Sequence, residues 1–289
     1  MIGLLAITFS VVLAAIVSLP ISALANGKIV NAPHQGTGSG TSTNWAGYVV
    51  PTTTDSGAVS AVSGSWIVPA VTGSGYSAIW VGMDGYSSNS AEQIGTEQAI
   101  INGKTQYSAW FEMYPNPPQK IDRPVNAGDN ITASVQYTNS SFVLTLQDNN
   151  WPTVFIVNET TDYTPQRNSA EWIIEAPSAS QGILPLADFG SIAINGMQAT
   201  IGDKTGALSN WMPVAMNMGN QSGGGIVQTN GLNTAGNSFT ASYVAVSSVE
   251  PVTSFTNPVG QGHNPGLQGK SASSHGRHLG WAKISGKSH

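Results

Sequence analysis

The chain has 289 residues, only 9% of them charged, and a formal net charge of −5 at pH 7. It contains no cysteine, which excludes disulfides, thiolate nucleophiles and cysteine-bound metals. None of the five histidines lies within residues 45–250, so we expect a folded region without an imidazole for a Ser-His or Cys-His system or for zinc. The domain also has no basic patch with interleaved aromatics, which argues against a nucleic-acid partner.

The acidic residues are confined to one part of the chain. All fifteen Asp and Glu fall between Asp55 and Glu250, where only five basic residues accompany them. Such a domain is nearly uncharged once its carboxylates are protonated, and it avoids the cationic self-repulsion that unfolds many proteins in acid. Composition alone leaves two interpretations open: a protein that works in acid, and a neutral secreted β-protein with a polar surface.

The N-terminal residues 2–25 are strongly apolar and uncharged, and Ala23-Leu24-Ala25 fits a small-x-small cleavage site. The pattern predicts a secretory signal peptide over residues 1–25, although no Lys or Arg precedes the apolar run. The alternative is an uncleaved membrane anchor, since the run is long enough to cross a bilayer. Residues 26–43 are rich in Gly, Ser and Thr and predict a linker or a short pro-segment.

From residue 44 the chain shows short alternating runs separated by Gly, Pro, Asn and Ser. Apolar residues alternate over 131–137 and again over 142–146, which predicts a β-hairpin, and residues 239–245 predict a further strand. No long segment shows a helical period. We therefore expect one all-β domain over residues 44–250, built as a sandwich or a barrel. Residues 251–289 predict a disordered basic tail, either inert or surface-binding.

A strand predicted over residues 169–177 carries an unusual pair of acids. Alternation places Glu171, Ile173 and Glu175 on one face of this strand, and Trp172 and Ile174 on the other. Two carboxylates on one face of a mostly apolar strand are costly to bury. This pair is therefore a candidate for chemistry.

Two further predicted strands combine aromatic and acidic residues on one face. Trp80 and Asp84 share a face of the strand at 77–85, and Trp110, Glu112 and Tyr114 share a face of the strand at 107–115. A third stretch, residues 91–97, begins Ala-Glu-Gln-Ile-Gly. Each alone is typical of a sandwich strand with an aromatic core residue and an acid at the rim. Together they predict one sheet face forming an aromatic, acidic binding groove.

Five motifs occur here in the order found in a known family: Asn44-Trp45-Ala46-Gly47, Trp80-Val81-Gly82-Met83-Asp84-Gly85, Gln93-Ile94-Gly95, Trp110-Phe111-Glu112-Met113-Tyr114-Pro115 and Ala170-Glu171-Trp172-Ile173-Ile174-Glu175. Over residues 44–248 the chain resembles the glutamic peptidases, the G1 or eqolisin family, formerly A4. The resemblance implies an antiparallel two-sheet β-sandwich of the concanavalin A-like lectin/glucanase type. It also implies a pepstatin-insensitive endopeptidase that acts on polypeptides at acidic pH, with a Gln–Glu dyad and without metal or cofactor.

Carried over residue by residue, the resemblance places the catalytic pair on Gln93 and Glu175. Its cleft-lining or supporting positions fall on Trp45, Trp80, Asp84, Trp110, Glu112, Tyr114 and Glu171. The chain departs from fungal relatives in lacking cysteines and in having Glu92 before the Gln and Ser108 on the Trp110 strand. These departures concern subsite preference and activation more than the dyad.

The dyad is chemically sufficient for peptide hydrolysis. A Glu carboxylate can take a proton from water and later give it to the leaving amine, and a Gln amide can donate to the developing oxyanion. One rival is a glycoside hydrolase using Glu171 and Glu175. Four residues of regular strand separate these acids by about 13 Å, too far for either class of glycosidase unless a bulge shortens the strand. A carbohydrate-binding module is the non-enzymatic alternative, and we expect a monomer in each case.

Overall fold

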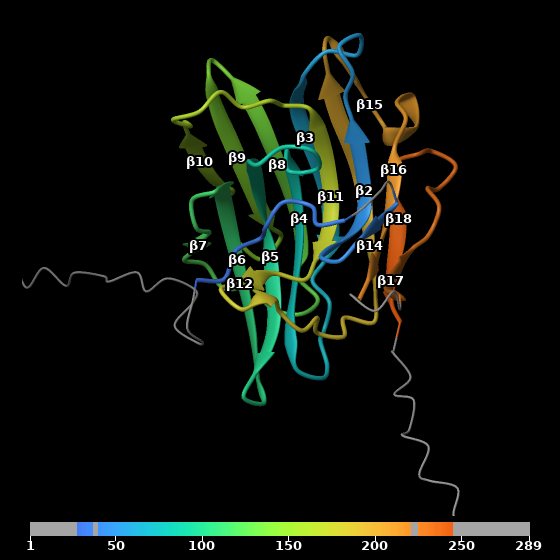
Figure 1. The fold of residues 1–289 in the computed structure, drawn as a ribbon. Coiled ribbons are helices and arrows are strands. Elements are labelled where there is room, and N and C mark those ends of the chain that lie inside the picture. Colours follow the sequence, from blue (N-terminus) through green and yellow to red (C-terminus); the bar gives the residue numbers. More distant parts are fainter. Residues whose placement is uncertain (1–27, 37–39, 221–224, 245–289) are drawn as a thin grey trace, which may run out of the picture. The chain divides into compact units, whose positions relative to one another are not determined.

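Antiparallel strands dominate the computed structural model, which describes residues 28–36, 40–220 and 225–244 (Figure 1). Within these ranges the one helical element is a single 3-10 turn, η1 (Leu208–Asn210). The expectation of an all-β domain is therefore confirmed. The predicted signal peptide at 1–25 and the predicted tail at 251–289 lie outside the described residues. Among those described, no helix is long and apolar enough to cross a membrane.

The strands follow one hydrogen-bonded path with two arms. The first arm runs in the order β10 (Phe155–Glu159), β9 (Ser141–Asp148), β8 (Asn130–Thr138), β3 (Val59–Ile67), β14 (Ser191–Ile201), β18 (Phe239–Tyr243) and β17 (Gly225–Thr229). The second arm follows through β16 (Val214–Gly219), β2 (Trp45–Pro51), β11 (Ser169–Glu175), β4 (Gly75–Met83), β5 (Ala91–Ile101), β6 (Lys104–Tyr114) and β7 (Gln119–Ile121). Short strands complete the domain: β1 (Thr41–Ser42), β12 (Ser178–Ala179), β13 (Gly182–Ile183) and β15 (Lys204–Gly206).

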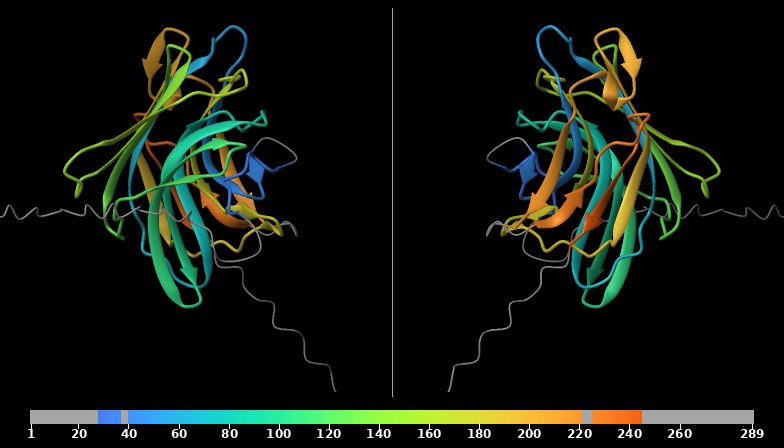
Figure 2. Two further views of the ribbon diagram at one scale, coloured as in Figure 1. Left: turned by 90° about the vertical axis from the view of Figure 1, so that its left-hand side faces the viewer. Right: turned by 90° about the vertical axis from the view of Figure 1, so that its right-hand side faces the viewer.

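The two arms lie face to face as two layers (Figure 2). Strand β4 of the second arm contacts β3 and β8 of the first without pairing with them, and β5 contacts β8 and β9. The space between the layers is filled by a large apolar core that includes Trp66, Ile79, Phe142 and Trp172. The lectin/glucanase-like type of this two-layer arrangement stays a prediction.

The predicted hairpin at 131–146 is confirmed as β8 and β9. Its turn residues Asn139 and Ser140 both have positive φ, at 49° and 61°, which is the backbone of the tight turn that matches strand twist. The strand predicted at 239–245 is β18, and the strand predicted around Glu171 is β11. Alternating polarity was thus a sound guide to the strands of both arms.

Candidate active site

The outer face of the second arm, away from the core between the layers, carries the predicted site. One cross-strand row consists of Glu171 on β11, Gly82 on β4, Gln93 on β5 and Glu112 on β6. Residues opposite one another in a sheet project to the same side, so these side chains share a face. Gln93, Glu112 and Glu171 are fully buried.

Aromatic side chains form the floor of this face. The next row along the strands contains Ile173, Trp80, Gly95 and Trp110. A Cβ at Gly95 would lie 2.1 Å from the Ile79 carbonyl oxygen and 2.6 Å from Trp80 Cβ, so no larger residue fits there. The Trp45 and Trp80 rings meet edge to face, with centroids 5.0 Å apart. This packing fixes the Trp80 indole beside both predicted catalytic residues.

Glu175 lies one row further along, opposite Ala78 and, across β4, Glu97. Trp80 Nε1 donates a hydrogen bond of 2.9 Å to Glu175 Oε2. The other oxygen, Oε1, is buried without a partner among the described residues. Glu175 therefore keeps one acceptor free on a carboxylate that is otherwise held in place.

Residues 28–36, which precede the first strand, cross this face as an extended segment, called here the N-terminal segment. Gln93 Nε2 donates to the Asn31 carbonyl oxygen at 2.8 Å and to Glu112 Oε2 at 3.0 Å. The Asn31 amide donates to the same Glu112 oxygen at 3.1 Å. Because both partners of Gln93 Nε2 are acceptors, they fix the orientation of the amide.

The N-terminal segment also reveals how Gln93 and Glu175 meet. They are not cross-strand neighbours, since Glu171 and not Glu175 shares the row of Gln93. However, the backbone amide of Ala32 interacts with Glu175, while the carbonyl of Asn31 accepts from Gln93. A carbonyl and the following amide belong to one planar peptide group. The two side chains therefore reach the same peptide group from two sides.

Burial controls the charge of this site. Desolvation raises the pKa of Glu175 well above its usual range and the nearby Glu112 carboxylate raises it further, whereas the Trp80 hydrogen bond and the nearby donor groups of Ala32 and Trp45 oppose this. Desolvation likewise raises the pKa of Glu112, against hydrogen bonds from Asn31 and Gln93. Two adjacent carboxyls in a dry site disfavour double ionisation. With the N-terminal segment in place, the site therefore favours protonated acids.

The remaining predicted residues occupy different surroundings. Glu171 is fully buried, and neither of its carboxylate oxygens has a hydrogen-bond partner among the described residues. Desolvation raises the pKa of Glu171 well above the usual range. Asp84 has φ of 65°, and its carboxylate accepts the backbone amides of Arg167 and Asn168, each at 2.8 Å. Asp84 thus holds the loop before β11, while Tyr114, partly exposed, shares the face of Glu112.

Two groups on this face were not identified from the sequence. Glu97 lies four residues along β5 from Gln93, and burial raises its pKa to about 7. Only the family resemblance selected Gln93, and alternation along the same strand places Glu97 on its face. Asn44 opens the first family motif but was assigned no role there, and its Nδ2 donates to the Ala32 and Pro33 carbonyls at 3.1 and 3.2 Å.

The expectation that the folded region lacks an imidazole is wrong. His34 packs against Tyr86 and Trp45, with ring centroids 5.2 and 5.9 Å apart, and its amide donates to the Gly85 carbonyl at 2.9 Å. Burial lowers the pKa of His34. The error arose because residues 26–43 have a linker-like composition, which carries no signal that part of them packs on the sheet.

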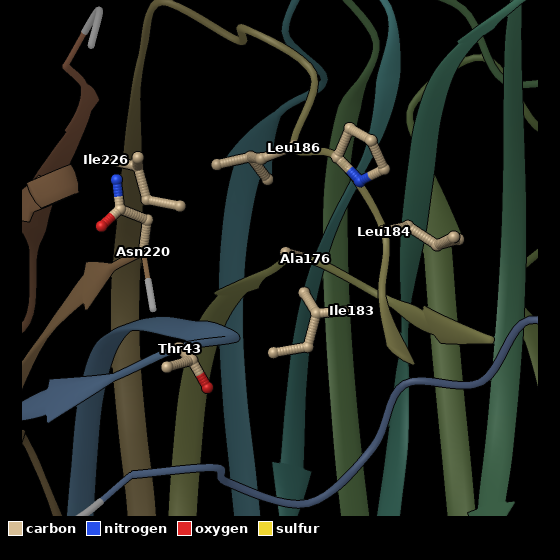
Figure 3. Close-up of a pocket in the computed structure, with 8 residues that line it drawn as sticks. Thr43, Ala176, Ile183, Leu184, Leu186, Asn220 and Ile226 are labelled. Carbon is tan, nitrogen blue, oxygen red and sulfur yellow. The ribbon is translucent and has the colours of Figure 1, made fainter. Parts of the chain in front are cut away.

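An apolar pocket of about 290 Å³ lies beside Ala176, the residue after Glu175, at the edge of the core between the layers (Figure 3). Its apolar side chains include Ile183, Leu184, Leu186 and Ile226. The N-terminal segment contributes no residue to its lining. The pocket is thus suited to an apolar side chain of a ligand lying along the end of β11.

The spacing of the two acids on β11 is decided by its register. Every residue from Glu171 to Glu175 pairs in unbroken sequence with β2 and β4. No bulge shortens the strand, so the acids stay about 13 Å apart along it, beyond the separation of glycosidase carboxyl pairs. This finding disfavours the glycoside hydrolase.

Comparison with known proteins places the chain in a family. Residues 43–244 match the Peptidase A4 family. Aspergillopepsin-2 from Aspergillus niger is 28% identical over 196 residues, which cover 57% of this chain and 66% of the relative, just under two thirds of its length.

Solved structures of similar proteins agree in fold. Scytalido-glutamic peptidase with a transition state analog inhibitor matches 70% of this chain and 98% of its own, with a TM-score of 0.61 and 22% identity. Aspergilloglutamic peptidase from Aspergillus niger matches 59% of this chain and 99% of its own, with a TM-score of 0.52 and 27% identity. Since the family match extends over most of the chain and over every strand of the site, the chain belongs to the Peptidase A4 family.

Proposed function

We propose that the chain is a secreted endopeptidase that hydrolyses polypeptides at acidic pH through Gln93 and Glu175. The observation that carries this proposal is a single peptide group in the cleft. Its carbonyl oxygen accepts from Gln93 Nε2 at 2.8 Å, and the Ala32 backbone on its other side lowers the pKa of the buried Glu175. An amide donor at the carbonyl and a carboxyl at the nitrogen are the two groups that peptide hydrolysis requires.

The chemistry follows from the remaining atoms of the pair. Gln93 Oε1 and Glu175 Oε1 are both buried acceptors without a partner among the described residues. A water that donates to both would be oriented towards the carbonyl carbon. Glu175 takes a proton as the water attacks, Gln93 Nε2 stabilises the oxyanion, and Glu175 then protonates the leaving nitrogen. No metal or cofactor is needed for any of these steps.

Acidic pH suits both the pair and the domain. Burial under the N-terminal segment raises the pKa of Glu175, whereas a solvated Glu has a pKa of about 4.3 and exchanges protons readily in acid, and a Gln amide keeps its character there. The domain between Asp55 and Glu250 carries few cations that would repel one another at low pH. Similarity to the Peptidase A4 relatives supports this assignment over a carbohydrate-binding module. Export through a cleaved leader at 1–25, a lectin/glucanase-like sandwich and a monomeric state complete the proposal.

Casein digestion at about pH 3 with pepstatin present, run beside a panel of polysaccharides, tests the proposal. Wild type should digest casein and leave the polysaccharides intact. Gln93→Ala and Glu175→Ala should each abolish digestion while keeping the wild-type circular dichroism spectrum. Glu159→Ala on β10 is the matched control, because it removes a carboxylate from the first arm, and it should digest normally. Casein digestion by Glu175→Ala would contradict the assignment of Glu175 as a catalytic residue.

A further inference from the structure

The two ends of the hydrogen-bonded path are protected to different degrees. An end strand offers unpaired backbone N–H and C=O groups, and natural proteins usually keep it short, charge it or interrupt it with proline. Strand β7, at one end, has three residues, includes Lys120 and follows Pro117 and Pro118. Strand β10, at the other end, has five residues and contains neither lysine nor proline (Figure 1). The free side of β10 is therefore the place where another strand can add.

Strand β10 is regular along its whole length. All five of its residues pair with β9 in unbroken register, so no bulge turns the strand away from a partner. Within the described ranges β9 is also the only strand with which β10 pairs. The backbone on the free side of β10 is thus available to a strand from outside the domain.

Both faces of β10 carry apolar side chains at this edge. Ile156 is 55% exposed and Val154, just before the strand, is 41% exposed. They are two of the five exposed large hydrophobic residues in the described part of the chain. On the other face, the partly buried Phe155 and Val157 pack against the core between the layers. A strand added at this edge would cover apolar surface on both sides of the sheet.

The sequence of β10 is complementary to itself in one antiparallel register. Residues opposite one another must point to the same face, so a two-fold axis between two copies of β10 passes through a residue. An axis at Ile156 sets Ile156 against Ile156 of the second copy and Phe155 against Val157 of the second copy. An axis at Val157 would instead set Phe155 against the charged Glu159. Pairs of aromatic and β-branched residues stabilise a sheet, which favours the axis at Ile156.

Charges agree with the same register. An axis at Ile156 sets Thr153 against Glu159 of the second copy. Arg123 Nη1 donates a hydrogen bond to the Thr153 carbonyl, and its guanidinium stacks over the rings of Trp151 and Phe155, 5.0 and 5.9 Å from their centroids. A fixed cation therefore lies beside the place that Glu159 of the second copy would take. The two-fold axis repeats this pairing at both ends of the contact.

We infer that β10 pairs antiparallel with β10 of a second copy of this chain, which joins the first arms of two molecules into one continuous sheet. Two five-residue strands form a small interface beside the roughly 1,200 Å² or more of stable specific complexes, so the pairing is reversible and depends on concentration. The monomer proposed above is then the form present in dilute assays. The inference does not depend on Gln93 or Glu175, and it holds whatever reaction they perform.

Sedimentation equilibrium of the full-length chain at about pH 6, from about 1 μM to about 1 mM, tests the inference. The average mass of wild type should rise from that of the monomer towards twice that value. Ile156→Lys places a charge on the edge and should remain a monomer throughout. Ile67→Lys is the matched control, since Ile67 is 51% exposed but lies on β3, an interior strand, and it should associate as wild type does.

Two results would overturn the inference. One is a wild-type mass that stays that of the monomer at about 1 mM, which would leave the edge to a different polypeptide. The other is association of Ile156→Lys at wild-type strength, which would place the contact elsewhere on the molecule. Circular dichroism spectra that match wild type would show that both lysine variants are folded.

Introduced thiols test the register directly, because the chain has no cysteine of its own. Ile156→Cys brings two Cβ atoms to about 4.5–5.5 Å across the two-fold axis, close enough for a disulfide after small shifts. Diamide, which takes up the two thiol hydrogens, should therefore link Ile156→Cys into dimers at least tenfold faster than Asn158→Cys or Ile67→Cys. Equal rates in the three variants, or faster linking of Asn158→Cys, would overturn pairing about Ile156.

Discussion

Strands β9 and β11 show two different ways of being buried. On β9, in the first arm, buried and partly exposed residues alternate along the whole strand. On β11, in the second arm, all seven residues are buried, including Glu171 and Glu175. A one-sided strand packs a single face on a core, whereas β11 is covered on both faces.

This difference indicates which face of β11 carries the candidate active site. The inner face of β11 carries Trp172 and Ile174 into the core shared by the arms. Its outer face is polar, and it is covered by the chain's own N-terminal segment in place of solvent. Buried polar groups need hydrogen-bond partners, and here peptide groups of the N-terminal segment supply some of them.

The largest effect is expected from filling the floor of the cleft. In Gly95→Ala the new Cβ would lie 2.1 Å from the Ile79 carbonyl oxygen, which is backbone and cannot move aside. We expect a loss of about 3 kcal/mol or more in the free energy of unfolding, or no folded protein, measured by urea denaturation. Gly225→Ala on β17, where a Cβ meets nothing within 4 Å, is the control and should cost less than about 1 kcal/mol.

Two tryptophans on opposite faces of the second arm allow the outer face and the core side to be compared by substitution. Trp80→Phe removes the hydrogen bond to Glu175, and Trp172→Phe removes a bond of 2.7 Å to the Ser63 carbonyl on the core side. Both should lower stability by about 1–2 kcal/mol, but only Trp80→Phe should lower kcat/KM, by about 10–100-fold.

The pH profile of Trp80→Phe gives a second test of the role of the hydrogen bond from Trp80 to Glu175. The Trp80 bond lowers the pKa of Glu175, so its loss raises that pKa. Because Glu175 must be ionised to accept a proton, the acid limb of kcat/KM should move to higher pH. An unshifted limb with wild-type activity would show that Trp80 only packs.

Stability should itself depend on pH in an unusual direction. Burial raises the pKa of Glu97 to about 7 and that of Glu92 to about 8, from 4.5. A carboxyl with a raised folded pKa contributes stability that is complete below the unfolded value and is lost as pH rises through the folded value. Urea unfolding should therefore show maximal stability below about pH 4.5 and a loss on the order of 3 kcal/mol per group by pH 8.

Isosteric variants check the origin of this loss. Glu97→Gln and Glu92→Gln keep an oxygen acceptor, which Glu92 needs for the Tyr163 hydroxyl at 2.7 Å. Each should flatten the decline above about pH 4.5 without changing stability in acid. A decline that is unchanged in the double variant would assign it to other groups.

The smallest effect is expected at the apolar pocket beside Ala176. Ile183→Ser removes part of its lining, which should reduce kcat/KM about 5–10-fold for peptides with a large apolar side chain at the matching position. Peptides with alanine there should be cut as before. Ile67→Ser, which alters an isoleucine 51% exposed on the first arm, should change neither.

Much of this arrangement could be predicted because strand alternation is a local property. The period of two placed Trp80, Trp110 and Glu112 on strands, whereas Gln93 came from the family resemblance, and the strands are where they were expected. Their grouping on one face needed only antiparallel neighbours, which the register provides.

Other features could not be predicted, because they depend on contacts distant in sequence. Asn31 lies 62 residues before Gln93, and nothing in a Gly/Ser/Thr-rich stretch indicates that its carbonyl reaches that side chain. The turn of Asp84 into a loop depends on a positive φ that alternation ignores. Register, not composition, also separates Glu171 from Glu175.

The choice between Glu171 and Glu175 is the most direct test of the account. Both lie on the outer face of β11, both are fully buried, and Glu171 shares the row of Gln93. The decisive measurement is kcat/KM of Glu175→Gln and Glu171→Gln on one peptide at about pH 3. We predict a loss of at least about 1,000-fold for Glu175→Gln and less than about 10-fold for Glu171→Gln. The reverse order would contradict the assignment of Glu175 as the catalytic acid and base.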